Sequence, residues 1–495
     1  MPPLEESSIE ELLTTLYLAL RLLLRPAEVE EIDAQFVECL ERELHALMRW
    51  AADSLFAIWL RRMLSGSELQ TRAIAARRAS CAHGWRHKGH RGVKLELLGG
   101  HHFKLKVAYG APGRPTAHKR TKRGKDQGHQ RTPVLEVLGF VDHQSPALAA
   151  ELLESSSACE SLQAARQQLH TRGIVRTSAQ LQRTTHRAAW MLREHLERWM
   201  QQPRQEGPLS QAGLAGRRVV LTFDGGRLRE RLAHRGRKKA NGYRNFSTSW
   251  VEPRLFVAYC IDEQGRMDKG FERITHASLA GPDELFAQLH GMLSTLQLEQ
   301  ADEVIVCADG QHWQWKRIET MLERLGVESS RIHLVLDMGH ALAHLHKVAE
   351  IRSGYGKERK AWEKEGRKLL KAGRIEELLE HGKLLARGPR APAITTAMKY
   401  FEKHKHRMDY PALRAAHRPT GSGVVESMIR QVINMRLKGC GKFWLREHAQ
   451  NMLMLRAWLK SRRLSDLYRY AHTQRVHWWY KHAETPEDSQ HALAS

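Results

Sequence analysis

The sequence has 495 residues, 42% of them hydrophobic, which is enough for two to four domains that each bury a core. Lys and Arg (79) outnumber Asp and Glu (55), and the formal net charge is +24 at pH 7. An excess this large attracts polyanions, most often nucleic acid, and its clustering along the chain disfavours a basic surface that is merely solvated.

The same composition argues against membrane and disulfide-rich classes. No apolar run has the length needed to cross a bilayer, and residues 1–8 lack the basic start and apolar core of a signal peptide. The six cysteines lie far apart with no CxxC spacing. We therefore expect no disulfide framework, a reducing compartment and a cytoplasmic protein without membrane contact.

Residues 1–80 are expected to form a helical module. Apolar residues recur at helical spacing within 8–80, and a second run of this kind lies within 36–59. The leucines of the first run share one stripe: Leu12, Leu13, Leu16, Leu20 and Leu23. Such a module would pack on itself or on a second copy of the chain.

Residues 81–150 change in composition to His, Gly, Lys and Arg. Alternating apolar positions at 93–97 and 103–107 predict a small β-hairpin. Cys81, His83, His87 and His90 offer zinc ligands, but their spacing matches no standard finger, so zinc is not expected. The stretch 114–131 is too charged to pack and predicts a mobile arm along DNA phosphates. Its contacts would be Lys119, Arg120, Lys122 and Arg123.

Residues 151–202 combine a helical segment, a break at 171–174 that contains Gly173, and a second helical segment rich in Gln, Arg and Thr. This pattern indicates a helix-turn-helix-like DNA-binding segment, and an ordinary pair of antiparallel helices fits it equally well. In the first case four side chains of the second helix would face base edges: Gln180, Gln182, Arg183 and Arg187. The Gln, Gly and Pro content of 203–216 predicts a linker.

Three apolar, β-branched runs that follow each end in an aspartate, namely Asp224, Asp309 and Asp337. Each run predicts a buried strand. Acids at the strand ends of an open α/β sheet share one crevice, where they repel one another unless a cation or protons lie between them. The sequence therefore favours a divalent metal site over the alternative that each Asp is only a turn former or a helix cap.

The order of elements around these runs indicates the fold class. A basic turn is expected at 227–239, strands at 251–259 and near 266–275, and a helix at 281–297. Three antiparallel strands followed by helix, strand, helix and strand is the order of a ribonuclease H-like α/β core, with a mixed five-stranded sheet flanked by helices. The Lys- and Glu-rich stretch 350–415 has helical spacing and predicts an all-helical insertion between core residues 217–349 and 416–470, before a tail at 471–495.

The segment after Gly423 also has helical spacing. Its apolar stripe comprises Val425, Met428, Ile429, Val432 and Met435. Glu426 lies at the edge of this stripe, where a carboxylate can reach the end of the sheet while the helix packs on it. The alternative is a first-turn Glu that the helix dipole favours.

The acids and their neighbours resemble the DDE transposases of bacterial insertion sequences and, more loosely, the Mutator-like transposases. Four motifs carry the resemblance in order: Phe-Asp-Gly at 223–225, Ala-Asp-Gly-Gln-His-Trp at 308–313, Leu-Asp-Met-Gly-His at 336–340 and Gly-Ser-Gly-Val-Val-Glu-Ser at 421–427. The resemblance covers residues 217–460, and 92–190 more weakly.

The resemblance implies a metal-binding catalytic triad of Asp224, Asp309 and Glu426. The triad would hold two Mg²⁺ ions, with Mn²⁺ as a substitute, and Asp337 and His340 would support it. Phosphate contacts near the scissile bond would come from three basic residues: Arg436, Lys438 and Lys442. Trp313 and Trp315 either stack on flipped bases or belong to the core.

By the same resemblance, the protein would bind the double-stranded ends of an insertion sequence, cleave them and join their 3′-hydroxyls to target DNA. It would act as a homodimer or larger assembly on DNA, associated with the nucleoid in a bacterial cytoplasm. Two alternatives stay open. One is a ribonuclease H-like nuclease or resolvase without strand transfer, and the other is a transposase-derived regulator that binds DNA without cutting it.

Overall fold

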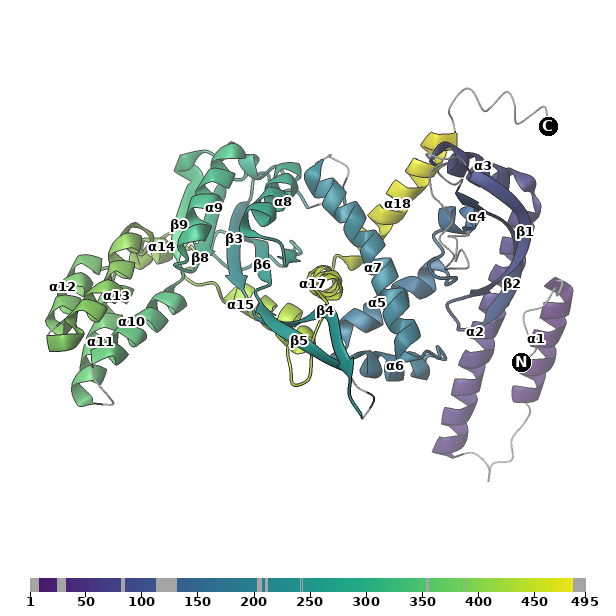
Figure 1. The fold of residues 1–495 in the computed structure, drawn as a ribbon, viewed down its shortest axis with the longest axis horizontal. Coiled ribbons are helices and arrows are strands. Elements are labelled where there is room, and N and C mark those ends of the chain that lie inside the picture. The colour runs from purple at the N-terminus through teal and green to yellow at the C-terminus, as the bar shows by residue number, and fades with distance from the viewer. Residues whose placement is uncertain are drawn as a thin grey trace. The chain divides into compact units, whose positions relative to one another are not determined.

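The computed structural model describes residues 9–24, 33–81, 85–112, 131–202, 207–209, 212–240, 242, 244–352, 356–386 and 388–483. The protein is a mixed α/β structure (Figure 1) with two compact units, Met1–Leu192 with Tyr468–Ser495, and Arg193–Leu467. None of the described helices has the length and apolar character needed to cross a membrane.

The first unit packs helices on a β-hairpin. Its elements are α1 (Ile9–Leu23), α2 (Ala34–Ser65), α3 (Ser67–Ala79), β1 (Trp85–Glu96), β2 (His102–Pro112), α4 (Pro133–Val137), α5 (Pro146–Ala158), α6 (Leu162–Thr171) and the first part of α7 (Ser178–Gln201). The expected helices and hairpin are confirmed, but the helices of residues 1–80 and the hairpin share one core, which includes Trp50, Leu95 and Val134. The regions 1–80 and 81–150 are therefore not separate modules.

The predicted leucine stripe of α1 is confirmed except at Leu13. Leu12 is buried, and Leu16, Leu20 and Leu23 pack against the same core. Leu13 is 55% exposed. The four packed residues follow the 3.6-residue period, whereas Leu13 lies about 100° around the helix from Leu12.

Two boundaries expected from the sequence are wrong. The linker predicted at 203–216 is packed at its described residues, since Leu209, Ala212 and Leu214 are buried and the Leu214 amide donates to the Leu296 carbonyl at 2.9 Å. The division between the units instead falls inside α7. The tail predicted at 471–495 begins as helix, because α18 extends over Leu464–Ala483 and buries Ala471.

The second unit is built on a five-stranded mixed sheet with the order β7-β6-β3-β8-β9. The strands are β3 (Arg218–Gly225), β6 (Arg254–Ile261), β7 (Ile274–Ser278), β8 (Glu303–Ala308) and β9 (Ile332–Leu336). β3, β8 and β9 are parallel, while β6 and β7 run antiparallel to their neighbours. This confirms the predicted mixed five-stranded sheet.

Two strand predictions in this unit need correction. The third sheet strand begins at Ile274 rather than near 266, because residues 266–273 form a loop. The expected basic turn at 227–239 is the first half of a separate two-stranded antiparallel ribbon, β4 (Leu228–Lys238) with β5 (Arg244–Val251). Its alternating arginines hide the strand period, because one face of the ribbon is basic instead of apolar.

Helices flank the sheet and fill the predicted insertion (Figure 1). The flanking helices are α8 (Pro282–Thr295), α9 (His312–Arg324) and α17 (Arg446–Lys460). The insertion consists of α10 (Met338–Arg352), α11 (Lys357–Lys371), α12 (Ile375–Leu385), α13 (Ala391–His404) and α14 (Tyr410–Ala415), so its described part is all-helical as expected. Short 3-10 turns are η2 (Leu298–Gln300), η3 (Ser329–Arg331), η4 (Gly388–Arg390) and η5 (Lys405–Arg407).

The helix that carries Glu426 contains a π-helical turn. It comprises α15 (Gly423–Ile429), the π turn η6 (Arg430–Asn434) and α16 (Met435–Leu437). The wider turn rotates the buried face, so Ile433 is buried and Met435 is 54% exposed. The predicted stripe is therefore correct as far as Val432 and wrong at Met435.

Arg456 on α17 stabilises this π turn. Its buried guanidinium donates to the Val432 carbonyl at 3.0 Å and also to the Gln431 carbonyl. Burial, and then the nearby charge of Arg436, lowers the pKa of Arg456 to about 10. A π turn disturbs the regular helical bonding of its carbonyls, and the arginine donates to two of them.

Candidate active site

The register of the parallel strands brings three acids to one level of the sheet. Phe223 on β3 pairs with Ala308 on β8, and Ala308 pairs with Leu336 on β9. The next residue of each strand is an acid: Asp224, Asp309 and Asp337. Neighbouring strands lie about 4.8 Å apart, so the three carboxylates leave the sheet side by side, as the sequence predicts.

Side-chain alternation decides which face the acids occupy. The ring of Phe223 stacks on Phe286 of α8, with 5.6 Å between the ring centroids. Successive side chains of a strand point to opposite faces, so Asp224 points away from α8. That opposite face is covered by the Glu426 helix, because α15 packs on β3 and β6.

Asp224 and Asp309 are held in a partly dry environment. Asp309 is 8% exposed and accepts a hydrogen bond from the Gln311 amide at 3.0 Å. Burial raises its pKa, and the charge of Glu252 adds to this. Burial also raises the pKa of Asp224 to about 6, although its hydrogen bond from the Gly225 amide (2.7 Å) and the charge of His340 act in the opposite direction. Two such neighbouring carboxylates favour a cation between them.

Asp337 has a different role, since it anchors two other parts of the site. Its carboxylate accepts hydrogen bonds from the His340 amide at 2.6 Å, from His340 Nδ1 at 3.0 Å and from the Ser422 amide. Although burial alone would raise the pKa of Asp337, these hydrogen bonds lower it to about 2. Asp337 therefore fixes both the ring of His340 and the loop that begins the Glu426 helix.

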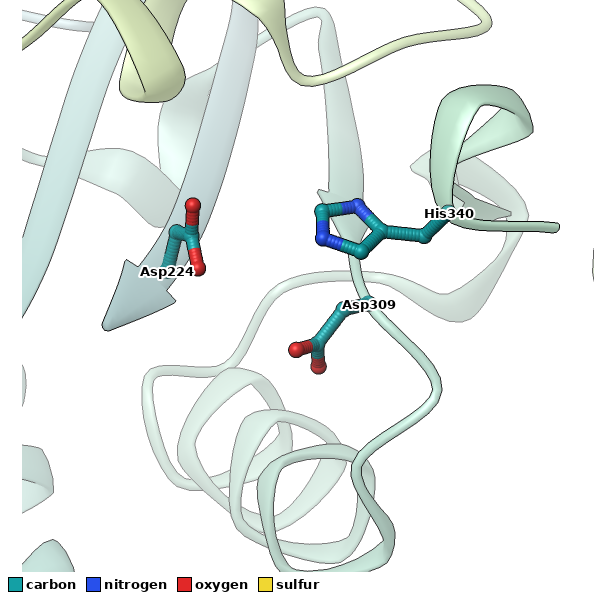
Figure 2. Close-up of side chains that lie close together, drawn as sticks. All are labelled: Asp224, Asp309 and His340. Atoms are coloured by element: carbon teal, nitrogen blue, oxygen red, sulfur yellow. The ribbon is translucent and has the colours of Figure 1, made fainter. Parts of the chain in front are cut away.

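His340 projects between the first two acids. Figure 2 shows its ring directed toward Asp224 and Asp309. The hydrogen bond with Asp337, reinforced by the charges of the surrounding acids, raises the pKa of His340 to about 9 even though burial opposes the shift. The imidazole is therefore protonated at neutral pH and supplies one positive charge to the acid cluster.

The five side chains form two overlapping groups with the donor set of a metal site. Asp224, Asp309 and His340 offer ligand atoms that all lie within 4.8 Å of one another, and so do Asp337, His340 and Glu426. Carboxylate oxygens suit Mg²⁺ and Mn²⁺. The protonated imidazole of His340 has no lone pair for a metal ion, so the ligands in these groups would be carboxylates. Glu426 is exposed and adjoins the first group closely enough that its charge raises the pKa of Asp224.

Two glycines permit close packing around the acids. A Cβ atom at Gly310 would lie 2.0 Å from the Tyr400 ring of the helical insertion. A Cβ atom at Gly226 would lie 2.8 Å from Ile433 of the Glu426 helix. Both glycines therefore serve tertiary packing here, since neither has a positive φ.

The second helix of the helix-turn-helix-like segment is α7, which begins after a turn that contains Gly173 (φ 79°). The Gln180 side chain accepts hydrogen bonds from Thr177 and completes a capping box. Arg183 and Arg187 both form ion pairs with Asp142, at 3.0 and 2.7 Å. DNA reading by this helix stays a prediction, together with the exposed Gln182.

The residues expected to contact the DNA backbone or bases divide into three cases. Lys438 is exposed and Lys442 partly buried on the loop after the Glu426 helix. Arg436 is 5% exposed with its guanidinium 5.3 Å from the Trp444 ring, so its side chain is packed inside the protein and its phosphate contact stays a prediction. The arm residues lie outside the described part of the chain: Lys119, Arg120, Lys122 and Arg123.

For Trp315 the structure agrees with the core alternative. This side chain is 4% exposed, and its ring nitrogen donates to the carbonyl of Asp309 at 2.9 Å. The guanidinium of Arg407 covers the ring at 4.2 Å. Trp315 therefore holds the backbone of a site residue, whereas the side chain of Trp313 lies outside the described residues.

Sequence reasoning missed Glu252, whose charge acts on Asp309. A signal was present, because Glu252 is the only acid between Glu230 and Asp262.

The residues considered as zinc ligands lie in the first unit, away from these acids in the sequence. Among the described residues, no group able to hold a metal includes Cys81, and His83 lies outside them.

Comparison with known proteins adds no family to this geometry. No protein-family model matches the sequence, and no curated protein matches it.

Proposed function

We propose that the chain is a metal-dependent DNA-cleaving and DNA-joining enzyme, a DDE-type transposase with a ribonuclease H-like core. The observation that carries the proposal is the alignment of Asp224 and Asp309 on adjacent parallel strands with Glu426 on the helix that covers them. The order β7-β6-β3-β8-β9, with a helical insertion before the Glu helix, supports the same assignment. So does the net charge of +24.

The proposed roles follow from the contacts of each side chain. Asp224, Asp309 and Glu426 would hold Mg²⁺, with Mn²⁺ as a substitute. Two such ions activate water or a 3′-hydroxyl and stabilise the leaving oxygen in an in-line displacement at phosphorus. The raised pKa values of Asp224 and Asp309 mark them as acids that gain most from a bound cation.

Asp337 and His340 would position the ligands rather than replace them. Asp337 holds the Ser422 amide at the start of the Glu426 helix and therefore sets the distance of that carboxylate from the sheet. The protonated His340 would orient the acids or contact a substrate phosphate. Lys438 and Lys442, on the loop that follows the Glu426 helix, would bind the DNA backbone without reading its sequence.

The experiment is a strand-transfer assay. Protein and Mg²⁺ are incubated with duplex DNA from the regions that flank the coding sequence, and plasmid DNA serves as target. We expect cleavage at the flanking ends and covalent joining of their 3′-hydroxyls to the plasmid. Cleavage without joining would assign the chain to the ribonuclease H-like nucleases or resolvases, and DNA binding without cleavage would assign it to the non-catalytic regulators.

Oligomeric state is a further part of the proposal. A reaction that pairs two DNA ends requires at least two active sites, so we expect a homodimer or larger assembly on DNA. Light scattering of the protein with and without end DNA measures this.

A further inference from the structure

The β4–β5 ribbon starts and ends at the acid cluster. β4 begins four residues after Asp224, and β5 ends at Val251, immediately before Glu252, whose charge acts on Asp309. Between Arg227 and Val251 the sequence has eight Lys or Arg residues and one acid, Glu230. The ribbon is therefore a strongly basic element rooted next to the proposed metal ligands.

One face of the ribbon combines arginines with aromatic rings. Arg229 lies opposite Trp250 in the register, with its guanidinium 4.9 Å from the indole ring. Arg231 lies two residues along on the same face, 5.4 Å from the ring of Phe246. Trp250 is 57% exposed and Phe246 is 37% exposed, although both are large apolar side chains.

The loop after the Glu426 helix extends this face. The backbone of Trp444 pairs with β4, donating to the Arg229 carbonyl at 3.0 Å and accepting from the Arg231 amide at 2.8 Å. Phe443, the preceding residue, lies 5.1 Å from the ring of Phe246 and 5.8 Å from the Arg229 guanidinium. The ribbon face, defined here as Arg229, Arg231, Phe246, Trp250 and Phe443, is thus linked by this loop to the helix of Glu426.

The charges on this face have no acidic partner. Among the described residues, no carboxylate forms an ion pair with Arg229 or Arg231, and the single acid of the ribbon, Glu230, points to the other face and pairs with Arg446 at 3.5 Å. The contrast with α7 is clear, because Arg183 and Arg187 are both bound by Asp142. The ribbon face keeps its charge for an external anion.

The chemistry of the face selects the kind of anion. Arginines bind phosphates, and an exposed indole offers a flat surface on which a base can stack. Stacking requires a base that has left the duplex, because paired bases present only their edges in the grooves. Unpaired nucleotides supply both a negative backbone and free base faces.

We propose that the ribbon face binds unpaired DNA nucleotides beside the scissile phosphate, with one base stacked on Trp250 and the adjoining phosphates held by Arg229 and Arg231. The placement of the phosphate rests on the proposed function. Arg229 is five residues from Asp224, so at most about 17 Å of chain separates the two, no more than the span of about five stacked nucleotides. The ribbon would hold the DNA end open while the acids act on it.

The test measures binding by the full-length protein in EDTA, so that it does not depend on cleavage. The probes are a 20-base-pair duplex of arbitrary sequence with five unpaired nucleotides on one strand, and the same duplex with blunt ends. We expect Trp250→Ala to weaken binding of the forked DNA by roughly 5- to 150-fold, the range that stacking of one base provides, and to leave the blunt duplex within about twofold. Trp250→Phe should restore most of the affinity.

The matched control is Trp59→Ala, which removes a similarly exposed tryptophan (50%) from α2 and should change neither affinity. A 2-aminopurine in the unpaired strand should lose fluorescence on binding to the wild type and to Trp250→Phe, but not to Trp250→Ala. Equal binding of both probes by wild type and Trp250→Ala would overturn the inference, as would a parallel loss on both probes. The protein could prefer the forked DNA to the blunt duplex and still not cleave DNA in Mg²⁺. In that case the proposed function is wrong, and the inference describes DNA binding alone.

Discussion

Replacing Asp337 by asparagine should change how the stability of the protein depends on pH. The hydrogen bond and charge of Asp337, reinforced by the charges of Asp224 and Asp309, raise the pKa of His340 from 6.5 to about 9. A shift of this size corresponds to about 3.4 kcal/mol, because one pKa unit is about 1.36 kcal/mol. The His340 side chain is 36% exposed, so solvent screening reduces the contribution to about 1–2 kcal/mol.

The sign follows from the direction of the shift. A raised pKa means that the folded protein binds the proton more tightly than the unfolded chain does. The stabilisation is therefore fully present below pH 6.5 and is lost as the pH rises through about 9. In Asp337→Asn the part of this contribution that comes from Asp337 is absent at every pH, so the stability difference from wild type should shrink between pH 6.5 and pH 9.5.

The assay is thermal unfolding in metal-free buffer at the two pH values. For a unit the size of Arg193–Leu467, 1 kcal/mol shifts Tm by about 2–4 °C, so the wild-type advantage should fall by about 2–8 °C from pH 6.5 to pH 9.5. The control is Asp283→Asn, which removes the acid that pairs with Arg317 in the same unit and should show no such change, because arginine does not titrate in this range. A Tm difference for Asp337→Asn that is equal at both pH values would refute the reasoning.

Three further predictions concern the ligands and their support. Amide substitution of each triad acid should abolish Mg²⁺-dependent nicking and leave DNA binding, measured by gel shift, intact or tighter. Retained nicking by the Glu426→Gln protein would instead assign the third metal ligand to Asp337. Arg456→Met leaves two carbonyls of the π turn without their donor in the core, so urea unfolding should show a loss of about 2–4 kcal/mol, and an unchanged midpoint would disprove this role. Gly310→Ala should cost about 1–3 kcal/mol against the ring of Tyr400, and adding Tyr400→Ala should relieve the part due to the clash; equal stability of Gly310→Ala and wild type would contradict the packing.

The convergence of the acids was predictable because its signals are local. Each run of apolar residues that stops at Asp224, Asp309 or Asp337 specifies a strand and its end, and parallel pairing then aligns the ends. The all-helical insertion was predictable for the same reason, since helical spacing is contained within each segment. Glu426 needed the motif order as well, because a first-turn Glu is common in any helix.

The features that sequence reasoning missed depend on contacts between distant residues. The π turn that exposes Met435 is stabilised by Arg456, more than twenty residues later. Asp142 pairs with arginines of α7 about forty residues away, which no periodicity reveals. The sequence predicts a turn at the first ribbon strand, β4, because its period is carried by arginine side chains instead of a buried apolar face.

The central claim, that Asp309 is a ligand of a catalytic metal ion, is tested most directly by exchanging the metal preference of the site. Asp309→Cys replaces an oxygen ligand by a thiolate, which Mg²⁺ binds poorly and Mn²⁺ or Co²⁺ accept more readily. We predict that DNA cleavage by this variant is lost in Mg²⁺ and recovered in Mn²⁺ or Co²⁺, while Asp283→Cys, at an exposed acid that pairs with Arg317, cleaves in Mg²⁺ like the wild type. Wild-type cleavage by Asp309→Cys in Mg²⁺ would contradict the claim.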